Sequence, residues 1–137
     1  NERICKESVY RHGNTSRPAT TMCKIASELS EDDIAALSEH YEDLSFVGVK
    51  QDFDSILVKK GVAIHKRHCE KCHSEGGSIA DDDAGLLAGQ WTPYLRLAIE
   101  NLLAEKRPMA DKMSVKMKLL DDEDFEALLS FYASKAQ

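Results

Sequence analysis

The sequence predicts an all-α protein, and three observations support this class. Apolar residues recur at the three- and four-residue spacing of amphipathic helices in several segments. Helix-start signals stand before several of these segments, including Thr92-Pro93, which places a proline at the first helical position. No alternating polar and apolar pattern of useful strand length occurs.

The composition is that of a folded globular protein. The 137 residues suffice for one ordinary domain, or for a small domain with an appendage. Hydrophobic residues make up 42% and charged residues 31%, which excludes a disordered chain. The net charge of −6 argues against nucleic acid or an anionic membrane as partner. No apolar run approaches the roughly 20 residues that cross a bilayer, so no membrane span is expected.

An internal repeat organises the helices. The segment Met22–Leu37 matches Met113–Leu128 at a constant offset, and the match continues to Tyr41 and Tyr132. Each copy consists of a methionine, six residues, a leucine, a helix-capping signal and an amphipathic helix.

The two capping signals predict where these repeated helices begin. Ser30 with Asp33, and Asp121 with Asp124, each supply a side-chain acceptor at the N-cap and acid in the first turn. The apolar stripes behind them are Ile34, Leu37, Tyr41 and Leu44 in one copy, and Phe125, Leu128, Leu129 and Tyr132 in the other.

The remaining segments complete the predicted order. A helix over 53–68 leads directly into a pair of cysteines, and residues 74–91 read as a loop. The helix that follows Thr92-Pro93 is expected to end before Pro108. A short hinge at 47–50 divides the chain into a segment 1–50 and a domain 51–137.

The residues Cys69-Glu70-Lys71-Cys72-His73 predict the attachment of one covalent haem c. Two thiols at this spacing add to the two vinyl groups of a haem, and the adjacent imidazole of His73 becomes the first axial ligand of the iron.

Three methionines that follow the helix predicted after Thr92-Pro93 are candidates for the second axial ligand. Met113 is favoured because it occupies the repeated position that Met22 holds in the other copy. Met109 is the alternative, and Met117 is expected to be a core residue. If all three methionines are only packing residues, the iron has no second axial ligand, and the site becomes that of a sensor or a peroxidase.

The other two cysteines, Cys5 and Cys23, are expected to form a disulfide, with two free buried thiols as the alternative. A structural zinc site is the rival interpretation of all four cysteines. Zinc requires four ligands, usually in two closely spaced pairs, and Cys5 and Cys23 lack that spacing.

In residues 51–137, the order of helix, Cys-x-x-Cys-His, loop, helix, methionine loop and final helix resembles a class I cytochrome c. Leu87-Ala88-Gly89-Gln90, Tyr94-Leu95 and Lys112-Met113 narrow the resemblance to cytochrome c4 and to the cytochrome subunit of flavocytochrome c sulfide dehydrogenase. Both families contain tandem class I domains, so residues 1–50 resemble a partial, haem-less cytochrome c-like segment.

The resemblance implies further roles. Gly61, with the bulky Ile64 one turn later, is expected to let the first helix cross the last one closely, against Phe131 and Tyr132. The family usually has a proline near position 85, whose carbonyl orients the haem histidine. Here Gly85 stands there, in a loop expected to be less rigid.

The surroundings of the haem are predicted from position. Gln90, Trp91, Tyr94 and Lys112 are expected to bind the propionates. The ring itself is expected to contact Ile79, Leu86, Leu87, Leu95, Ile99, Leu102 and Met109. The other histidines, His12, His40, His65 and His68, are expected at exposed positions.

The expected function is one-electron transfer by a periplasmic monohaem cytochrome c with His73 and Met113 as axial ligands. Residues 1–5 have neither a charged leader nor an apolar stretch, so an exported chain is expected here in its mature form. Such a protein is not an enzyme by itself, and its partners are redox proteins. The alternative is the electron-accepting subunit of an oxidoreductase complex, with a flavoprotein as its partner.

Overall fold

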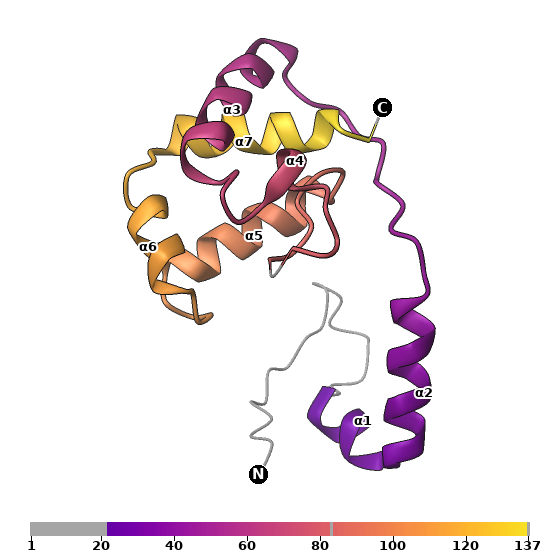
Figure 1. Ribbon diagram of the computed structural model, residues 1–137. Coiled ribbons are helices and arrows are strands. Elements are labelled where there is room, and N and C mark those ends of the chain that lie inside the picture. The colour runs from indigo at the N-terminus through magenta and orange to yellow at the C-terminus, as the bar shows by residue number, and fades with distance from the viewer. Residues whose placement is uncertain (1–21, 83, 137) are drawn as a thin grey trace, which may run out of the picture. The chain divides into compact units, whose positions relative to one another are not determined.

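The structure is a computed structural model that describes residues 22–82 and 84–136. These residues form seven helices and no strand, which confirms the predicted all-α class (Figure 1). The chain divides into two compact units, Asn1–Ser45 and Phe46–Gln137. None of the described helices has both the length and the apolar character needed to span a membrane.

The described part of the first unit consists of helices α1 (Met22–Glu28) and α2 (Glu31–Glu42). The predicted start of α2 is confirmed. Ser30 Oγ accepts a hydrogen bond from Asp33 N at 3.1 Å, and Asp33 Oδ2 accepts one from Ser30 N at 3.0 Å. This reciprocal pair satisfies two amides that the helix leaves without partners. No residue of α2 is buried.

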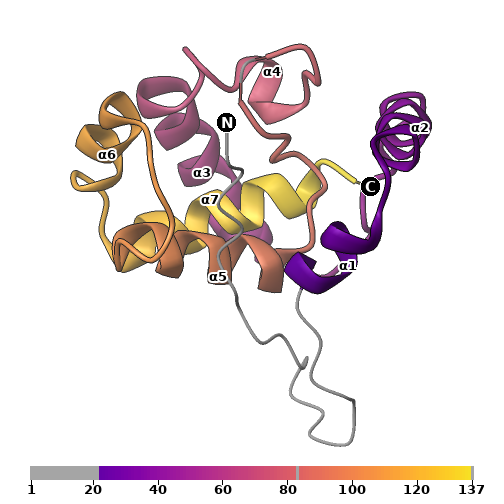
Figure 2. The same cartoon turned by 90° about the horizontal axis from the view of Figure 1, so that it is seen from below.

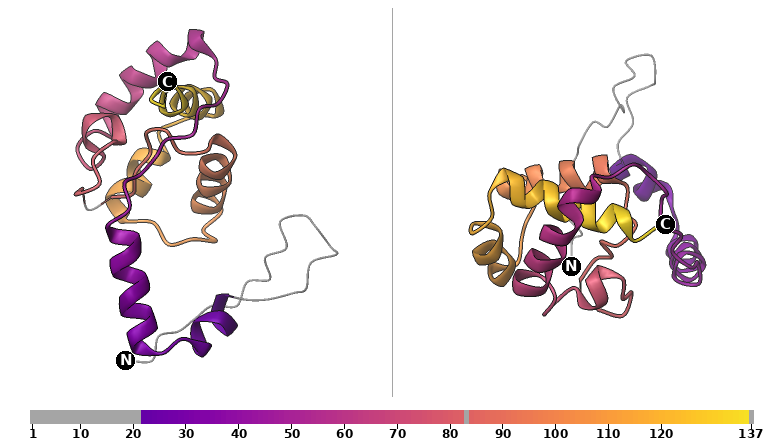
Figure 3. Two further views of the ribbon diagram at one scale, coloured as in Figure 1. Left: turned by 90° about the vertical axis from the view of Figure 1, so that its right-hand side faces the viewer. Right: turned by 90° about the horizontal axis from the view of Figure 1, so that it is seen from above.

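The second unit contains α3 (Ser55–His68), α4 (Ser74–Gly77), α5 (Thr92–Leu103), α6 (Asp111–Met117) and α7 (Asp122–Ser134). Helix α7 lies between α3 and α5 (Figure 2), and contacts both of them. In the left panel of Figure 3, where α7 is seen nearly end-on, α3 and α5 lie on different sides of it. Helix α7 is therefore the central element of this unit.

The crossing of α3 and α7 depends on Gly61. A Cβ atom at this position would lie 2.7 Å from Phe131 Cβ, and closer still to the carbonyl oxygen of Ala127. Because any larger side chain would separate the two backbones, the close approach requires glycine here. This confirms the role expected for Gly61.

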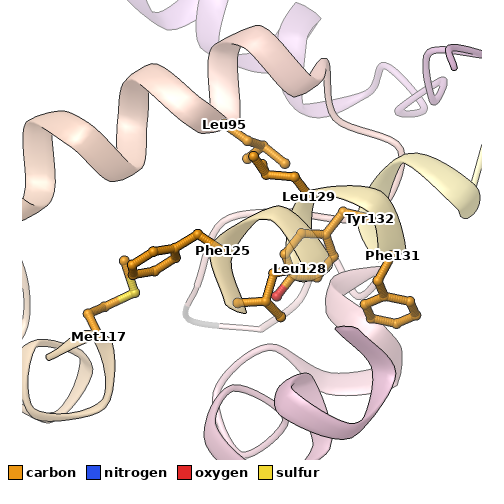
Figure 4. Close-up of a cluster of buried hydrophobic side chains, with 7 residues drawn as sticks. All are labelled: Leu95, Met117, Phe125, Leu128, Leu129, Phe131 and Tyr132. Carbon is orange, nitrogen blue, oxygen red and sulfur yellow. The ribbon is translucent and has the colours of Figure 1, made fainter. Parts of the chain in front are cut away.

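A cluster of buried side chains forms the core of the second unit (Figure 4). Leu95 of α5 packs beside Leu129 of α7, and Met117 of α6 lies beside Phe125 of α7. Met117 is 7% exposed, which confirms that it is a packing residue. The remaining members of the cluster are Leu128, Phe131 and Tyr132.

Three helices lie where the sequence predicted none. Helix α1 occupies the stretch that begins at Met22, before the first capping signal. Helix α6 occupies the segment that was expected to be a methionine loop, and α4 lies within the expected loop 74–91. The start of α5 also differs by one residue, because Trp91 and not Thr92 is its N-cap.

The segment 46–51 is tied to the second unit and is not a free hinge. Val49 N donates to Gly89 O at 2.8 Å. Gln51 Nε2 donates to Gln90 O at 2.8 Å, and its Oε1 accepts from Thr92 N at 2.9 Å. The compact second unit accordingly starts at Phe46, a few residues before the boundary predicted after residue 50.

Candidate haem-attachment site

The cysteine motif forms a tight turn at the end of α3. Cys69 is the C-cap of this helix, and its N–H donates to His65 O at 2.8 Å. The amides of Cys72 and His73 both donate to Cys69 O, at 3.1 and 3.0 Å. Both cysteines are free thiols, with Cys69 half-buried and Cys72 exposed. Burial raises the pKa of the Cys69 thiol, so it is protonated at neutral pH.

His73 is oriented by a backbone carbonyl. Its Nδ1 lies 3.1 Å from Gly85 O, and because a carbonyl only accepts, Nδ1 carries the proton. The lone pair is then on Nε2, the nitrogen that a metal would bind. Gly85 therefore presents its carbonyl to His73, as the resemblance led us to expect of the family's proline near this position. A Cβ at Gly85 would meet nothing within 4 Å, so packing does not require glycine there.

His65 was predicted to be exposed, and this prediction was wrong. Its ring is only 1% exposed and lies in the α3–α7 crossing, against Phe131 and Tyr132 at centroid distances of 5.4 and 5.6 Å. His65 follows Gly61 by four residues and therefore shares its helix face. It fills the place that was expected for Ile64, which is only partly buried against the core.

Both ring nitrogens of His65 have partners. Nδ1 lies 2.9 Å from the Tyr132 hydroxyl, while Nε2 lies 3.0 Å from His73 O and 2.8 Å from Glu70 Oε2. Burial lowers the pKa of His65, so the ring is neutral at neutral pH. Because Nε2 faces two acceptors, it carries the proton, and Nδ1 accepts from Tyr132.

The other three histidines differ in their positions. His40 is exposed on α2, as predicted, and His12 lies outside the described residues. His68 is half-buried and not exposed, and its buried Nδ1 has no hydrogen-bond partner within the described part of the chain.

The loop after the motif is held by two carboxylates. Glu70 accepts from the amides of Glu75 and Gly76 at 3.0 and 3.4 Å. Asp82 accepts from Ser74 N at 2.6 Å and from Ser74 Oγ at 2.8 Å. Burial opposes the ionisation of Glu70, but the amides of Gly76 and Glu75 and the ring of His65 outweigh it and lower the pKa of this carboxyl.

Two methionines are available as a second ligand. Met109 and Met113 are both half-buried and pack against the core cluster, whereas Met117 is buried within it. Met113 lies on α6, and Met109 lies in the segment before that helix. The choice of Met113 over Met109 stays a prediction.

The residues predicted around the ring differ in exposure. Leu95 is buried, Leu87, Ile99 and Met109 pack against the core cluster, Leu86 and Leu102 are half-buried, and Ile79 is 37% exposed. Of the residues predicted to bind propionates, Gln90 is half-buried, while Trp91, Tyr94 and Lys112 are exposed.

A pocket lies away from the cysteine motif. It measures about 500 Å³ and is lined by Trp91 together with Gln51, Asp52, Thr92, Pro93, Arg96, Leu97 and Glu100. Trp91 therefore faces this pocket, which none of the motif residues lines.

The predicted disulfide falls outside what the structure describes. Cys5 lies in the segment 1–21, and the side chain of Cys23 is not described either. Among the described residues, no group of three or more His, Cys, Asp or Glu side chains could hold a metal ion. Axial ligation by one histidine and one methionine does not require such a group.

No protein-family model and no curated protein matches the chain. The chemistry of the site is therefore inferred from its own residues. Two thiols are available at the attachment spacing, an imidazole has its metal-binding nitrogen free of a proton, and two half-buried thioethers pack on the adjoining core. This donor set fits a covalently attached haem.

Proposed function

We propose that this protein is a one-electron carrier, a periplasmic monohaem c-type cytochrome with His73 and Met113 as axial ligands. The observation that carries the proposal is the hydrogen bond of 3.1 Å between His73 Nδ1 and Gly85 O, within a Cys-x-x-Cys-His turn. Such an outer bond fixes the tautomer and the ring orientation of a ligating histidine, and makes it a stronger donor to the metal.

The roles of the chain follow from its chemistry. Cys69 and Cys72 would hold the haem covalently, and His73 and Met113 would ligate its iron. When bound, haem supplies a one-electron cycle between Fe(II) and Fe(III). The thioether of Met113 is a soft ligand that favours Fe(II) and raises the reduction potential. With both ligands supplied by the chain, the iron would have no place for a substrate, so the protein would carry electrons and would not catalyse a reaction by itself.

One observation favours a second candidate, the electron-accepting cytochrome subunit of an oxidoreductase complex such as a flavocytochrome c sulfide dehydrogenase. The apolar stripe of the first unit is exposed, with Leu37 41%, Tyr41 67% and Leu44 55% accessible. Contiguous exposed apolar residues are typical of surfaces that bind another protein. Co-purification of the native protein with a flavin-bearing chain would favour this candidate over a freely diffusing carrier.

The decisive experiment is the haem content and spectrum of the protein made in a host that attaches haem c. We expect one covalent haem per chain and a low-spin spectrum with the weak sulfur-to-iron band in the red. Met113→Ala should remove this band, and Met109→Ala, the matched control, should retain it. The absence of covalent haem would refute the proposal, and two haems would refute a monohaem protein. A high-spin ferrous spectrum with carbon monoxide binding would indicate the open-iron sensor or peroxidase.

A further inference from the structure

The buried imidazole of His65 is a polar group for which the proposed function gives no role. It connects α3 to α7, which is distant in the sequence, and to the cysteine turn that follows α3. A polar group in a core costs stability unless its hydrogen bonds are satisfied, and here both nitrogens are satisfied. The surrounding structure is thus built to hold this ring in one orientation.

One hydrogen bond of His65 reaches His73. The Nε2–H of His65 donates to the main-chain carbonyl of His73 at 3.0 Å, while the side chain of His73 bonds to Gly85 O at 3.1 Å. His73 is therefore held by its main chain on one side and by its ring on the other. The two bonds together restrict both the position of its Cα and the direction of its imidazole.

We propose that His65 is a positioning residue that sets the orientation of the His73 imidazole through the His73 carbonyl. This inference rests on the proposed function, because it assigns His65 a role toward a haem held at Cys69 and Cys72. The Tyr132 hydroxyl and the Glu70 carboxylate support that role. The carboxylate only accepts, so it selects the tautomer of His65 in which Nε2 is the donor, and the hydroxyl then donates to Nδ1.

Packing alone does not account for a histidine at this position. The ring lies against Phe131 and Tyr132, in a place that a phenylalanine would fill with no polar atom to satisfy. Only the donor on Nε2 distinguishes the imidazole from such a ring in its effect on His73. The test therefore separates the shape of the side chain from its donor.

Two substitutions make this separation in the haem-loaded protein. His65→Phe keeps an aromatic ring and removes the donor, whereas His65→Gln gives up the ring and keeps an N–H near the place of Nε2. One readout is the solvent exchange of the His73 Nδ1 proton, measured by proton NMR in the reduced, diamagnetic form. The other is the reduction potential, which rises when a ligating imidazole becomes a weaker donor.

We expect His65→Phe to speed the exchange about tenfold, roughly the factor that one net hydrogen bond represents, and to raise the reduction potential. His65→Gln should stay within about twofold of the unchanged protein in exchange, and should keep its potential. If His65→Phe behaves as the unchanged protein, or if both variants change equally, the donor has no role and the inference is overturned.

A second variant keeps the test decisive if His65→Phe does not fold. His65→Phe combined with Tyr132→Phe removes the hydroxyl that would otherwise lose its hydrogen bond to His65. It is compared with Tyr132→Phe alone, and the same two readouts apply. Failure of the proposed function looks different, because the unchanged protein would then contain no covalent haem.

Discussion

The two copies of the internal repeat have the same local structure and different burial. In each copy a seven-residue helix precedes a capping box and a longer helix, as α1 and α2 in the first unit and as α6 and α7 in the second. Helix α7 is buried at every position from Phe125 to Ala133 except Glu126, whereas α2 has no buried residue. Capping and helix formation are thus encoded locally, whereas burial depends on a partner.

The partner of α7 explains the difference. Helix α3 supplies Gly61, at which the two backbones meet, and His65, which fills the crossing. The same stripe of apolar residues can therefore be a core or a surface, depending on the helix that packs against it. The following predictions test this comparison at matched positions, from the largest expected effect to the smallest.

The largest difference in the stability lost on substitution is expected between Leu128 and Leu37, which occupy equivalent positions in the repeat. Leu128 is 4% exposed, so Leu128→Ala leaves a cavity and should cost about 2–5 kcal/mol of the free energy of unfolding. Leu37 is 41% exposed, and Leu37→Ala should change it by less than about 0.5 kcal/mol. Denaturant unfolding of both variants measures the difference. Equal losses would mean that the stripe of α2 has a packing partner after all.

Gly61→Ala should break the contact that gives α7 its partner. The added methyl overlaps the backbone of α7, and the forced shift should cost about 1–3 kcal/mol. Gly85→Ala is the matched control, because its methyl would enter open space and should leave stability unchanged or raise it by about 0.4–1 kcal/mol. Thermal unfolding of the two variants is the measurement, and a neutral Gly61→Ala would contradict the close crossing.

The effect of removing each capping box should depend on whether the helix that it caps is buried. Asp121→Ala removes the acceptor for Asp124 N, at 2.8 Å, and should destabilise the second unit by about 1 kcal/mol. Ser30→Ala removes the equivalent bond of α2, whose helix lacks buried residues. We expect its effect in the helical circular dichroism signal and not in the main unfolding transition. A shift of that transition by Ser30→Ala would show that the two units unfold together.

The smallest effect concerns an ion pair that α7 has and α2 lacks. Glu126 binds Arg96 of α5 through both carboxylate oxygens, and the equivalent position in α2 is Ala35. The Arg96 guanidinium lowers the pKa of Glu126. The stabilisation is therefore complete above the unfolded value of 4.5, and is lost as the pH falls through the folded value.

Both side chains of this pair are nearly half exposed, so Glu126→Gln should cost only about 0.2–1 kcal/mol at neutral pH. Below the folded pKa the variant and the unchanged protein should be equally stable. Urea unfolding at neutral and at acidic pH tests this. A difference in stability between the two proteins that grows on acidification would contradict the prediction.

The features that the sequence predicted correctly depend on neighbours along the chain. Ser30 and Asp121 mark helix starts because the bonded amides lie three residues away. The short α6 was missed, since seven residues give too few turns for an apolar periodicity to be read from the sequence. His65 was misplaced because its residue type suggests the surface, and the groups that satisfy it, Tyr132 and the His73 carbonyl, meet only in the folded chain. One signal was present: Gly61 and His65 share a helix face.

The turn after the cysteine motif has a consequence for the two residues between the cysteines. Glu75 and Gly76 have φ angles of 52° and 73°, and their two adjacent amides face one carboxylate, which makes a small nest that suits an anion. The carboxylate of Glu70 occupies this nest, so the chain provides its own anion there. Lys71 is exposed and makes no comparable contact with the nest. Of the two residues between the cysteines, Glu70 thus supplies the anion that the nest binds, and Lys71 can be replaced by other residue types.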